Sequence, residues 1–389
     1  MRVLIAPDAF GSDLGATQTA AAMAVGWERG APHDEVRTLP LSDGGPGFLD
    51  VVQQAVGGTT VAVTVSDPLG REVPAAILLV DEGERRTAWV EAAQASGLHL
   101  LAADERDPGV TSTWGVGQLL DAAVAEGASR VVLGVGGSAT NDAGAGMLAA
   151  LGAGPASALA RGGLALAEVG DGVLVGLPGV LDRLRGVELV LATDEETPLL
   201  GLSGTSAADA PGKGATQEQA QALESALGHF TDVLTRALPA PATDLLTGRP
   251  RRLDREPGAG AAGGLGYALL ALGARPVGAV AEVLRVTGFE VAAAGSDLVV
   301  TGTGRLDWTA VRGSVVSGVA EATLQTGRAV VAVTGECLVG RRETMTMGLA
   351  GVYAVAEQPR EREALMVDPV ATLEARVARV ARTWSPPAR

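Results

Sequence analysis

Residues 3–41, VLIAPDAFGSDLGATQTAAAMAVGWERGAPHDEVRTLPL, contain the pattern that decides the fold. A short apolar run at 3–6 predicts a buried strand. The alanine-rich stretch 16–29 predicts a helix, which the glycine and proline of 30–32 would end. The mixed charged and apolar run 35–41 predicts a second strand. A strand, a helix and a strand within about 40 residues indicate a βαβ unit with a parallel sheet.

The C-terminal third repeats this alternation. Strands are predicted at 297–301, 328–333 and 351–355, with helices between and after them. Because both ends of the chain show the same pattern, we expect them to share one Rossmann- or flavodoxin-like parallel sheet.

The middle of the chain has a different pattern. Three short strands are predicted close together at 61–65, 74–80 and 87–90, which favours antiparallel or mixed pairing. Further strands at 130–134 and 187–192 alternate with helices at 114–126, 217–238 and 262–272. The fold class expected is therefore α/β, with a Rossmann- or flavodoxin-like domain (1–58 plus 286–389) and a second, inserted α/β domain (59–285). The proline- and arginine-rich segment 239–257 is expected to be a mobile loop.

Composition excludes several classes of protein. The 389 residues are 47% hydrophobic and 19% charged, which excludes a disordered chain. A net charge of −15 without a basic cluster makes nucleic acid and membrane poor partners. A single cysteine, Cys337, cannot form an internal disulfide, and no apolar run resembles a membrane span. We expect a soluble, cytoplasmic protein.

A glycine-rich turn, GVGGSATNDAGAG, occupies residues 134–146. A predicted strand at 131–133 enters it and a predicted helix at 147–151 leaves it. Glycine lets backbone N–H groups approach an anion, hydroxyls add donors, and a helix N-terminus favours negative charge. The pattern favours an anion-binding turn for phosphate or carboxylate over a turn that is merely tight. Its candidate binding residues are Gly136, Gly137, Ser138, Thr140, Asn141 and Asp142.

A second glycine-rich turn, PGAGAAGGLG at 257–266, also leads into a helix but contains no side-chain donor. Two interpretations stay open for it: backbone binding of a phosphate, or close helix packing. On the first, Gly260, Gly263 and Gly264 would bind the cofactor.

Four aspartates come directly after predicted strands: Asp8, Asp43, Asp194 and Asp307. In open α/β sheets, ligands bind at the carboxyl ends of strands. One such aspartate is usually a helix cap, but four of them fit a site that holds Mg²⁺ and orients an attacking hydroxyl.

Two basic residues are candidates for contact with a phosphate. Lys213, the only lysine, lies between glycines in PGKG and is expected to be exposed, either reaching a phosphate or merely solvated. Arg305, in GTGRLD, is the better placed of the two. The three histidines share no ligand or triad spacing and are expected to be structural: His33, His99 and His229.

Seven motifs of the chain resemble those of the bacterial glycerate kinase family (class I glycerate 2-kinases) and occur in the same order. They are PDAF at 7–10, SDGG at 42–45, GVGGSATNDAGAGM at 134–147, TDEETPLLG at 193–201, PGKGA at 211–215, PGAGAAGGLG at 257–266 and TGTGRLD at 301–307. The resemblance implies two α/β domains, one of them inserted into the other. It also implies transfer of the γ-phosphoryl group of ATP to D-glycerate or a related hydroxy acid, with Mg²⁺, to give 2-phosphoglycerate.

The residue roles expected for such a reaction divide into three sets. Asp43 or Asp194 would orient and deprotonate the substrate hydroxyl, while Lys213 and Arg305 would balance phosphoryl charge. Asp194 and Asp307 are the candidate Mg²⁺ ligands. Asp8 and the two glycine-rich turns complete the set expected to bind the nucleotide or the substrate.

Departures from the family pattern leave one alternative open. Gly11 and Ser314 stand where the family has lysine, and Pro46 and Thr303 stand where it has glutamate. Phosphoryl transfer depends on such charges, so the alternative is a catalytically silent member that binds a metabolite or protein partner. A dinucleotide-dependent oxidoreductase is disfavoured, because PDAF rather than G-x-G-x-x-G follows the first strand. A homo-oligomer stays open.

Overall fold

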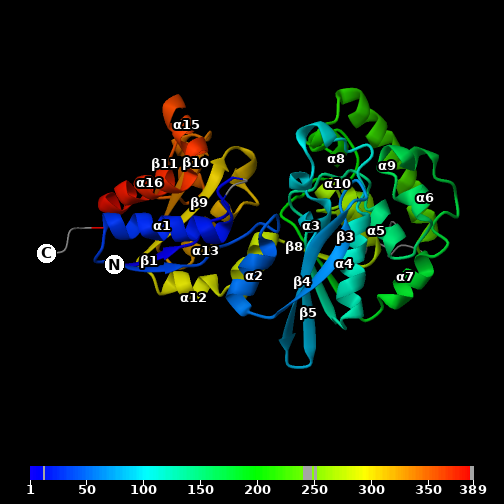
Figure 1. The fold of residues 1–389 in the computed structure, drawn as a ribbon, viewed down its shortest axis with the longest axis horizontal. Helices are drawn as coiled ribbons and strands as arrows, with labels where there is room; N and C mark the ends of the chain where they lie inside the picture. The colour runs from blue at the N-terminus through cyan, green and yellow to red at the C-terminus, as the bar shows by residue number, and fades with distance from the viewer. Residues whose placement is uncertain (12–13, 240–247, 249–251, 386–389) are drawn as a thin grey trace. The chain divides into compact units, whose positions relative to one another are not determined.

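The computed structural model describes residues 1–389 except 12–13, 240–247, 249–251 and 386–389 (Figure 1). The loop expected at 239–257 therefore lies largely outside the described residues. The chain forms two compact units. Unit 1 comprises Met1–Asp43, Asp50–Gly57 and Gly278–Arg389, and unit 2 comprises Gly44–Leu49 and Gly58–Val277. The domain limits expected from the sequence, 1–58 plus 286–389 and 59–285, stay a prediction.

Unit 1 contains a five-stranded sheet to which both ends of the chain contribute. Its order is β11-β10-β9-β1-β2, and every neighbouring pair is parallel. The α/β class with a parallel sheet from both chain ends is thus confirmed. The strands are β1 (Arg2–Ile5), β2 (Glu35–Thr38), β9 (Leu298–Leu306), β10 (Ala329–Cys337) and β11 (Gly351–Ala354). Strand β2 follows β1 in the chain and lies on one side of it. On the other side of β1 lies β9, and β10 and β11 continue outward from β9. The strand order therefore reverses between β1 and β9.

Strand β9 runs further than the sequence pattern predicted, ending at Leu306 rather than 301. The extension pairs with β10, Thr303 opposite Thr334 and Arg305 opposite Glu336. The glycines of TGTG concealed this strand from the sequence analysis, because glycine usually weakens a strand. Arg305 is consequently held at a strand end rather than in a loop.

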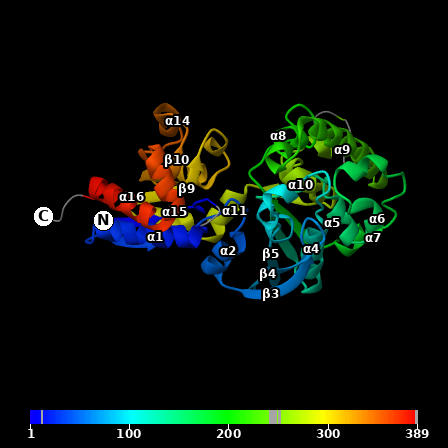
Figure 2. The same cartoon turned by 45° about the horizontal axis from the view of Figure 1, so that its top comes forward.

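The helices of unit 1 cover its sheet. Helices α1 (Ala16–Gly30) and α16 (Pro369–Trp384) lie side by side in both Figure 1 and Figure 2. Trp27 and Val377 from these helices are buried in one cluster with Ile5 and Val300 of the sheet. Residues 3–5 of β1 are apolar and buried under this cover, as the run at 3–6 indicated. The other helices are α11 (Ala279–Val286), α12 (Phe289–Ala294), α13 (Val315–Leu324), α14 (Arg341–Thr346) and α15 (Pro359–Val367), with a 3₁₀ turn at Thr309–Val311.

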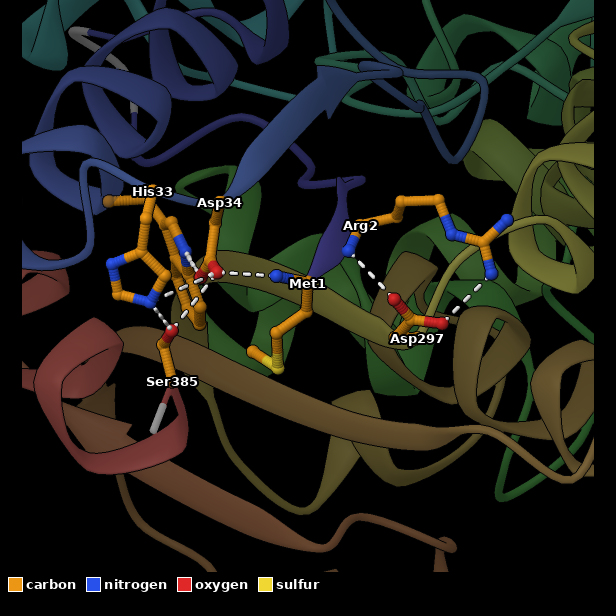
Figure 3. A network of polar contacts seen from close by, with 7 residues as sticks. Met1, Arg2, His33, Asp34, Asp297 and Ser385 are labelled. Atoms are coloured by element: carbon orange, nitrogen blue, oxygen red, sulfur yellow. Dashed lines mark hydrogen bonds and ion pairs between the residues drawn. The ribbon is translucent and has the colours of Figure 1, made fainter. Parts of the chain in front are cut away.

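Asp34 ties the chain ends of unit 1 together (Figure 3). Its carboxylate accepts hydrogen bonds from the amino group of Met1 at 2.6 Å, from Trp27 Nε1 at 2.9 Å and from Ser385 Oγ at 3.0 Å. These bonds lower the pKa of Asp34 although burial opposes the shift. His33 Nε2 lies 3.0 Å from Ser385 Oγ, so His33 has the structural role that its sequence context predicted.

Unit 2 contains a six-stranded mixed sheet with the order β3-β4-β5-β6-β7-β8. The pairs β3–β4 and β4–β5 are antiparallel and the others are parallel, which confirms the mixed pairing expected for the middle of the chain. The strands are β3 (Thr59–Ser66), β4 (Glu72–Glu82), β5 (Arg85–Glu91), β6 (Arg130–Gly134), β7 (Glu188–Ala192) and β8 (Arg275–Val277).

The helices of unit 2 include the three long ones predicted from the sequence: α4 (Trp114–Ala125), α9 (Gln217–Ala237) and α10 (Ala261–Ala271). The shorter ones are α3 (Ala93–Ser96), α5 (Ala145–Ala150), α6 (Ala156–Leu159), α7 (Leu177–Arg183) and α8 (Thr205–Ala208). Helix α2 (Phe48–Val56) begins in unit 2 and continues in unit 1. Within the described part of the chain, no helix is long and apolar enough to cross a membrane.

Candidate active site

Two of the predicted aspartates follow neighbouring strands of unit 1. Asp8 comes after β1 and Asp43 after β2, and the two segments stay paired beyond the strands, since Leu41 N donates to Pro7 O at 2.9 Å. Burial, and then the charge of Asp43, raise the pKa of Asp8 well above its ordinary value, against a bond from Ala9 N to Asp8 Oδ1. Asp43 itself is exposed. The arrangement is a carboxyl pair in which one member readily holds a proton.

Arg305 and Asp307 lie at the carboxyl end of β9, also in unit 1. Arg305 Nε is 3.1 Å from Asp307 Oδ2, and Asp307 Oδ1 accepts bonds from Thr309 N and Oγ1. The Thr309 bonds, together with Arg305, lower the pKa of Asp307, while burial opposes them. Asp307 is therefore ionised, but protein donors already engage both of its oxygens.

Lys213 lies in unit 2 and is buried, which corrects the expectation that it is exposed. Only 8% of the residue is accessible, and its Nζ donates to Thr140 O at 2.9 Å. The flanking glycines suggested a solvated loop, but the segment Ala210–Lys213 forms a 3₁₀ turn that points the side chain inward. Burial lowers the pKa of Lys213, and the carboxylates of Asp209, Glu195 and Asp142 oppose this shift.

Lys213 lines a hollow of about 340 Å³. Ser138 and Gly137, from the turn after β6, contribute one side of it, while Glu195 and Asp209 add carboxylates. Ser138 Oγ lies 2.9 Å from Thr140 Oγ1 and accepts a bond from Thr140 N at 3.1 Å. The hollow thus brings together a cation, a hydroxyl and two anions at the carboxyl end of the sheet.

The remaining polar residues of the 134–146 turn are fully buried. Asn141 Nδ2 donates to Ser206 Oγ at 3.1 Å, and its buried Oδ1 has no hydrogen-bond partner. Asp142 accepts four bonds: from Thr113 N and Oγ1, Gly144 N and Gly146 N. Burial nevertheless raises the pKa of Asp142. Asp142 therefore holds the turn in shape, and a direct contact with a ligand stays a prediction for it.

The glycines of the two glycine-rich turns allow the turns to interlock. A Cβ atom on Gly263 would lie 1.9 Å from Thr140 O, and one on Gly264 would lie 2.8 Å from Ala143 Cα. A Cβ atom on Gly136 would lie 2.9 Å from Gly45 N, in the SDGG motif. The amides of Gly136, Gly260 and Gly264 already donate to backbone carbonyls. The structure gives these glycines a packing role, so anion binding through them stays a prediction.

Backbone strain accompanies this interlocking. Ala143 (φ 49°) and Ala262 (φ 54°) are the two non-glycine residues with positive φ in the described part of the chain. Ala262 lines the Lys213 hollow, and Ala143 N donates to Gly263 O at 3.0 Å. Strained residues of this kind persist where the surrounding structure fixes them, and they concentrate at ligand sites.

Asp194 follows β7 in unit 2 and is half-buried, whereas Asp307, the other expected Mg²⁺ ligand, belongs to unit 1. Among the described residues, no group of three or more His, Cys, Asp or Glu side chains is arranged to hold a metal ion. Mg²⁺ in phosphoryl-transfer sites usually takes only one or two carboxylates, with water and phosphate completing its shell. A magnesium role for either residue stays a prediction.

Comparison with known proteins places this geometry in a family. The sequence model described as "Glycerate kinase family" matches residues 3–385. The chain belongs to the glycerate kinase family. It is 36% identical to glycerate kinase of Bacillus subtilis (strain 168), over 91% of this chain and 90% of the relative. It is 35% identical to glycerate 2-kinase of Escherichia coli (strain K12), with the same coverage of both chains.

A solved structure supports the same assignment. The crystal structure of a candidate glycerate kinase 2 from Salmonella typhimurium LT2 matches 98% of this chain and 96% of that one, with 33% identity and a TM-score of 0.73. The fold of the family therefore extends over nearly the whole chain, including the segments in which motif lysines and glutamates are replaced.

Two polar residues of the Lys213 hollow were missed in the sequence analysis. Glu195 lies inside the TDEETPLLG motif, directly after the aspartate that drew attention there. Asp209, whose Oδ2 accepts a bond from Thr205 Oγ1 at 3.0 Å, lies in the segment before Lys213. The signal that could have found both is Lys213, since a buried ammonium needs nearby carboxylates.

Proposed function

We propose that this chain is a glycerate kinase that transfers the γ-phosphoryl group of ATP to a hydroxyl of D-glycerate, giving 2-phosphoglycerate, with Mg²⁺. The observation that carries the proposal is the match to the family across residues 3–385, together with relatives named glycerate kinase at about 35% identity over nine tenths of the chain. A silent role has no comparable observation in its favour.

In the proposed reaction, the hydroxyl oxygen of glycerate forms a bond to the γ-phosphorus while the bond from that phosphorus to the β–γ bridging oxygen breaks. ADP leaves, and the hydroxyl proton moves to a carboxylate. We assign the proton either to Asp43, with Asp8 as the neighbour that shares it, or to Asp194. The raised pKa of Asp8 supports the first assignment, because a carboxyl pair with a raised pKa accepts a proton more readily.

Lys213 is the residue we assign to the anionic groups of the reaction. An ammonium has three N–H donors, and Thr140 O takes one of them. The surrounding carboxylates favour the charged form of Lys213 against the effect of burial. A hollow of about 340 Å³ with a hydroxyl from Ser138 suits the carboxylate of a three-carbon acid or a phosphoryl group.

Asp194 and Asp307 are the two carboxylates that we propose for Mg²⁺. Asp194 offers oxygen, the ligand type that Mg²⁺ prefers. Asp307 would bind the metal in exchange for its bonds from Arg305 and Thr309, and we propose either residue as a metal ligand. When bound, Mg²⁺ supplies positive charge that stabilises the transferring phosphoryl group. Arg305 would supply further positive charge, as a guanidinium already oriented by Asp307.

The test is release of ADP from ATP in the presence of D-glycerate and Mg²⁺, for the wild type and for Asp194→Asn. We expect the wild type to turn over and the variant to lose at least about 10²-fold in kcat, because one removed charge at the reacting group costs that much. Asp182→Asn, an exposed carboxylate paired with Arg185, is the control and should match the wild type.

Two outcomes would contradict parts of the proposal. Equal turnover by Asp194→Asn and the wild type would remove Asp194 from the site. Absence of ADP release by the wild type, combined with no heat of ATP binding in calorimetry, would favour the silent family member.

A further inference from the structure

A hollow of about 550 Å³ lies in unit 1 at the point where the strand order reverses. Ala9, Phe10 and Gly11, which follow β1, line one side of it, and Thr303 and Arg305 of β9 line another. Ligands of open α/β sheets bind outside the carboxyl ends of the strands at such a reversal. Apart from Arg305, the residues of this hollow have no part in the proposed reaction.

The backbone segments that line the hollow pack closely on one another. Gly304 N donates to Ala9 O at 3.3 Å, and a Cβ atom on Gly304 would lie 2.4 Å from Gly11 N. A Cβ atom on Gly335 would lie 2.3 Å from Gly304 O and 3.3 Å from the ring of Phe10. The loop after β1 therefore packs directly on the ends of β9 and β10, and the space above them is preformed.

One wall of the hollow is apolar. Leu365 and Met366 of α15, Pro369 at the start of α16 and Phe10 contribute to it. Met366 is 78% exposed, so this wall presents apolar surface to an occupant. A three-carbon hydroxy acid has little apolar surface to bury there, whereas the face of a nucleobase fits against methionine, leucine and phenylalanine side chains.

The polar residues of the hollow lie beside this wall. Glu336 of β10 forms an ion pair with Arg362 of α15, and its side chain is 24% exposed. A carboxylate held in this way can accept two hydrogen bonds from a vicinal diol. Arg305, which Asp307 orients, and Arg362 place two guanidinium groups at the hollow, and their N–H donors suit a phosphate attached to that diol-bearing unit.

We infer that this hollow binds the nucleoside part of ATP, with the base against Leu365 and Met366 and the two ribose hydroxyls donating to Glu336. The inference rests on the proposed function only in naming ATP as the phosphoryl donor. It adds a specificity: Glu336 distinguishes ribonucleosides from 2′-deoxyribonucleosides.

Calorimetry on the full-length chain with adenosine and 2′-deoxyadenosine tests the inference without any turnover. We expect the wild type to bind adenosine about tenfold more tightly than 2′-deoxyadenosine, and Glu336→Gln to lose most of this discrimination. Met366→Ala should weaken both ligands alike by a few-fold. Glu363→Gln and Val367→Ala, exposed neighbours on α15 that do not line the hollow, should bind as the wild type does.

Steady-state kinetics separates this inference from the proposed function. If Glu336→Gln raises KM for ATP and leaves KM for D-glycerate unchanged, both stand. If wild-type turnover is normal but Glu336→Gln raises KM for D-glycerate alone, or adenosine and 2′-deoxyadenosine bind equally to the wild type, the nucleoside site is overturned. If the wild type binds adenosine with the expected discrimination but does not phosphorylate D-glycerate, the function fails and the site stands.

Discussion

Unit 1 and unit 2 each desolvate an ionisable group at the carboxyl end of a sheet, but the negative charges beside the two groups shift their pKa values relative to burial in different ways. In unit 1, Asp43 carries the same charge as Asp8, so burial and charge both raise the pKa of Asp8. In unit 2, burial lowers the pKa of Lys213, but Asp209 and Glu195 counteract the shift. The neighbouring carboxylates thus add to the effect of burial on the acid of unit 1 and oppose the effect of burial on the cation of unit 2.

The two units also differ in backbone strain. Both non-glycine residues with positive φ among the described positions, Ala143 and Ala262, belong to unit 2, beside the interlocked glycine-rich turns. In unit 1, Gly304 and Gly335 also lie in close contact with neighbouring backbone, but they are strand residues without a positive φ. Unit 2 therefore shapes its site with strained turns, and unit 1 shapes its site with the ends of regular strands.

The largest effect is expected from removing the cation of unit 2. Lys213→Met should lower kcat/KM for phosphorylation of D-glycerate by about 10²–10³-fold, because the charge on the transferring group loses its buried partner. Arg161→Met, which removes an exposed cation of the same unit, should stay within about twofold. Similar losses in both variants would mean that Lys213 acts only through net charge.

A smaller effect, on stability, is expected where the turns of unit 2 interlock. Gly263→Ala should lower the free energy of unfolding by about 2–4 kcal/mol, since its Cβ would collide with Thr140 O at a residue that also has positive φ. Gly172→Ala has a similar φ but nothing within 4 Å of its Cβ, so it isolates the backbone strain and should cost about 1 kcal/mol. Urea unfolding midpoints of the two variants provide the comparison, and equal midpoints would refute the interlocking.

The opposite pKa shifts of Asp8 and Lys213 predict opposite pH dependences of stability. The folded pKa of Asp8 lies above its unfolded value, so its stabilising contribution is present below the unfolded pKa and is lost as the pH rises. Asp8→Asn should therefore reduce the decline in unfolding free energy between acidic and neutral pH. Lys213, with a lowered pKa, makes stability rise with pH on the alkaline side, and Lys213→Met should reduce that rise.

Urea titrations across the pH range measure both slopes. Asp50→Asn, an exposed aspartate on α2, serves as the control and should give the wild-type slope. A slope unchanged by Asp8→Asn would show that the pair with Asp43 does not hold a proton in the folded state.

The smallest effect is expected at the strained alanine of the Lys213 hollow. Ala262→Gly removes a buried methyl group but relieves the positive φ, so its unfolding free energy should stay within about 0.5 kcal/mol of the wild type. Ala268→Gly, fully buried in regular α10, has no strain to relieve and should lose about 1–2 kcal/mol. A loss at Ala262 as large as that at Ala268 would mean that the left-handed backbone there is not strained.

The sequence by itself determined the elements and their order. The apolar run at 3–6, the alanine-rich helix at 16–29 and the clustered strands of the middle segment all formed as predicted, because periodicity and local propensity act within one element. The motifs likewise identified the family. Strand β9 was predicted too short, since its last residues are strand only through pairing with β10.

Tertiary structure decided how the site residues are used. Glycines on both sides of Lys213 favoured exposure in the sequence, yet the fold buries its side chain against Thr140 and two carboxylates. The glycine-rich turns suggested anion binding, yet in the fold Gly263 and Gly264 of one turn pack against Thr140 and Ala143 of the other. The physical reason is the same in both cases. Burial, pKa values and close packing depend on contacts between residues that are distant in the chain, such as Thr140 and Gly263. A local sequence pattern does not show which distant residues will be in contact.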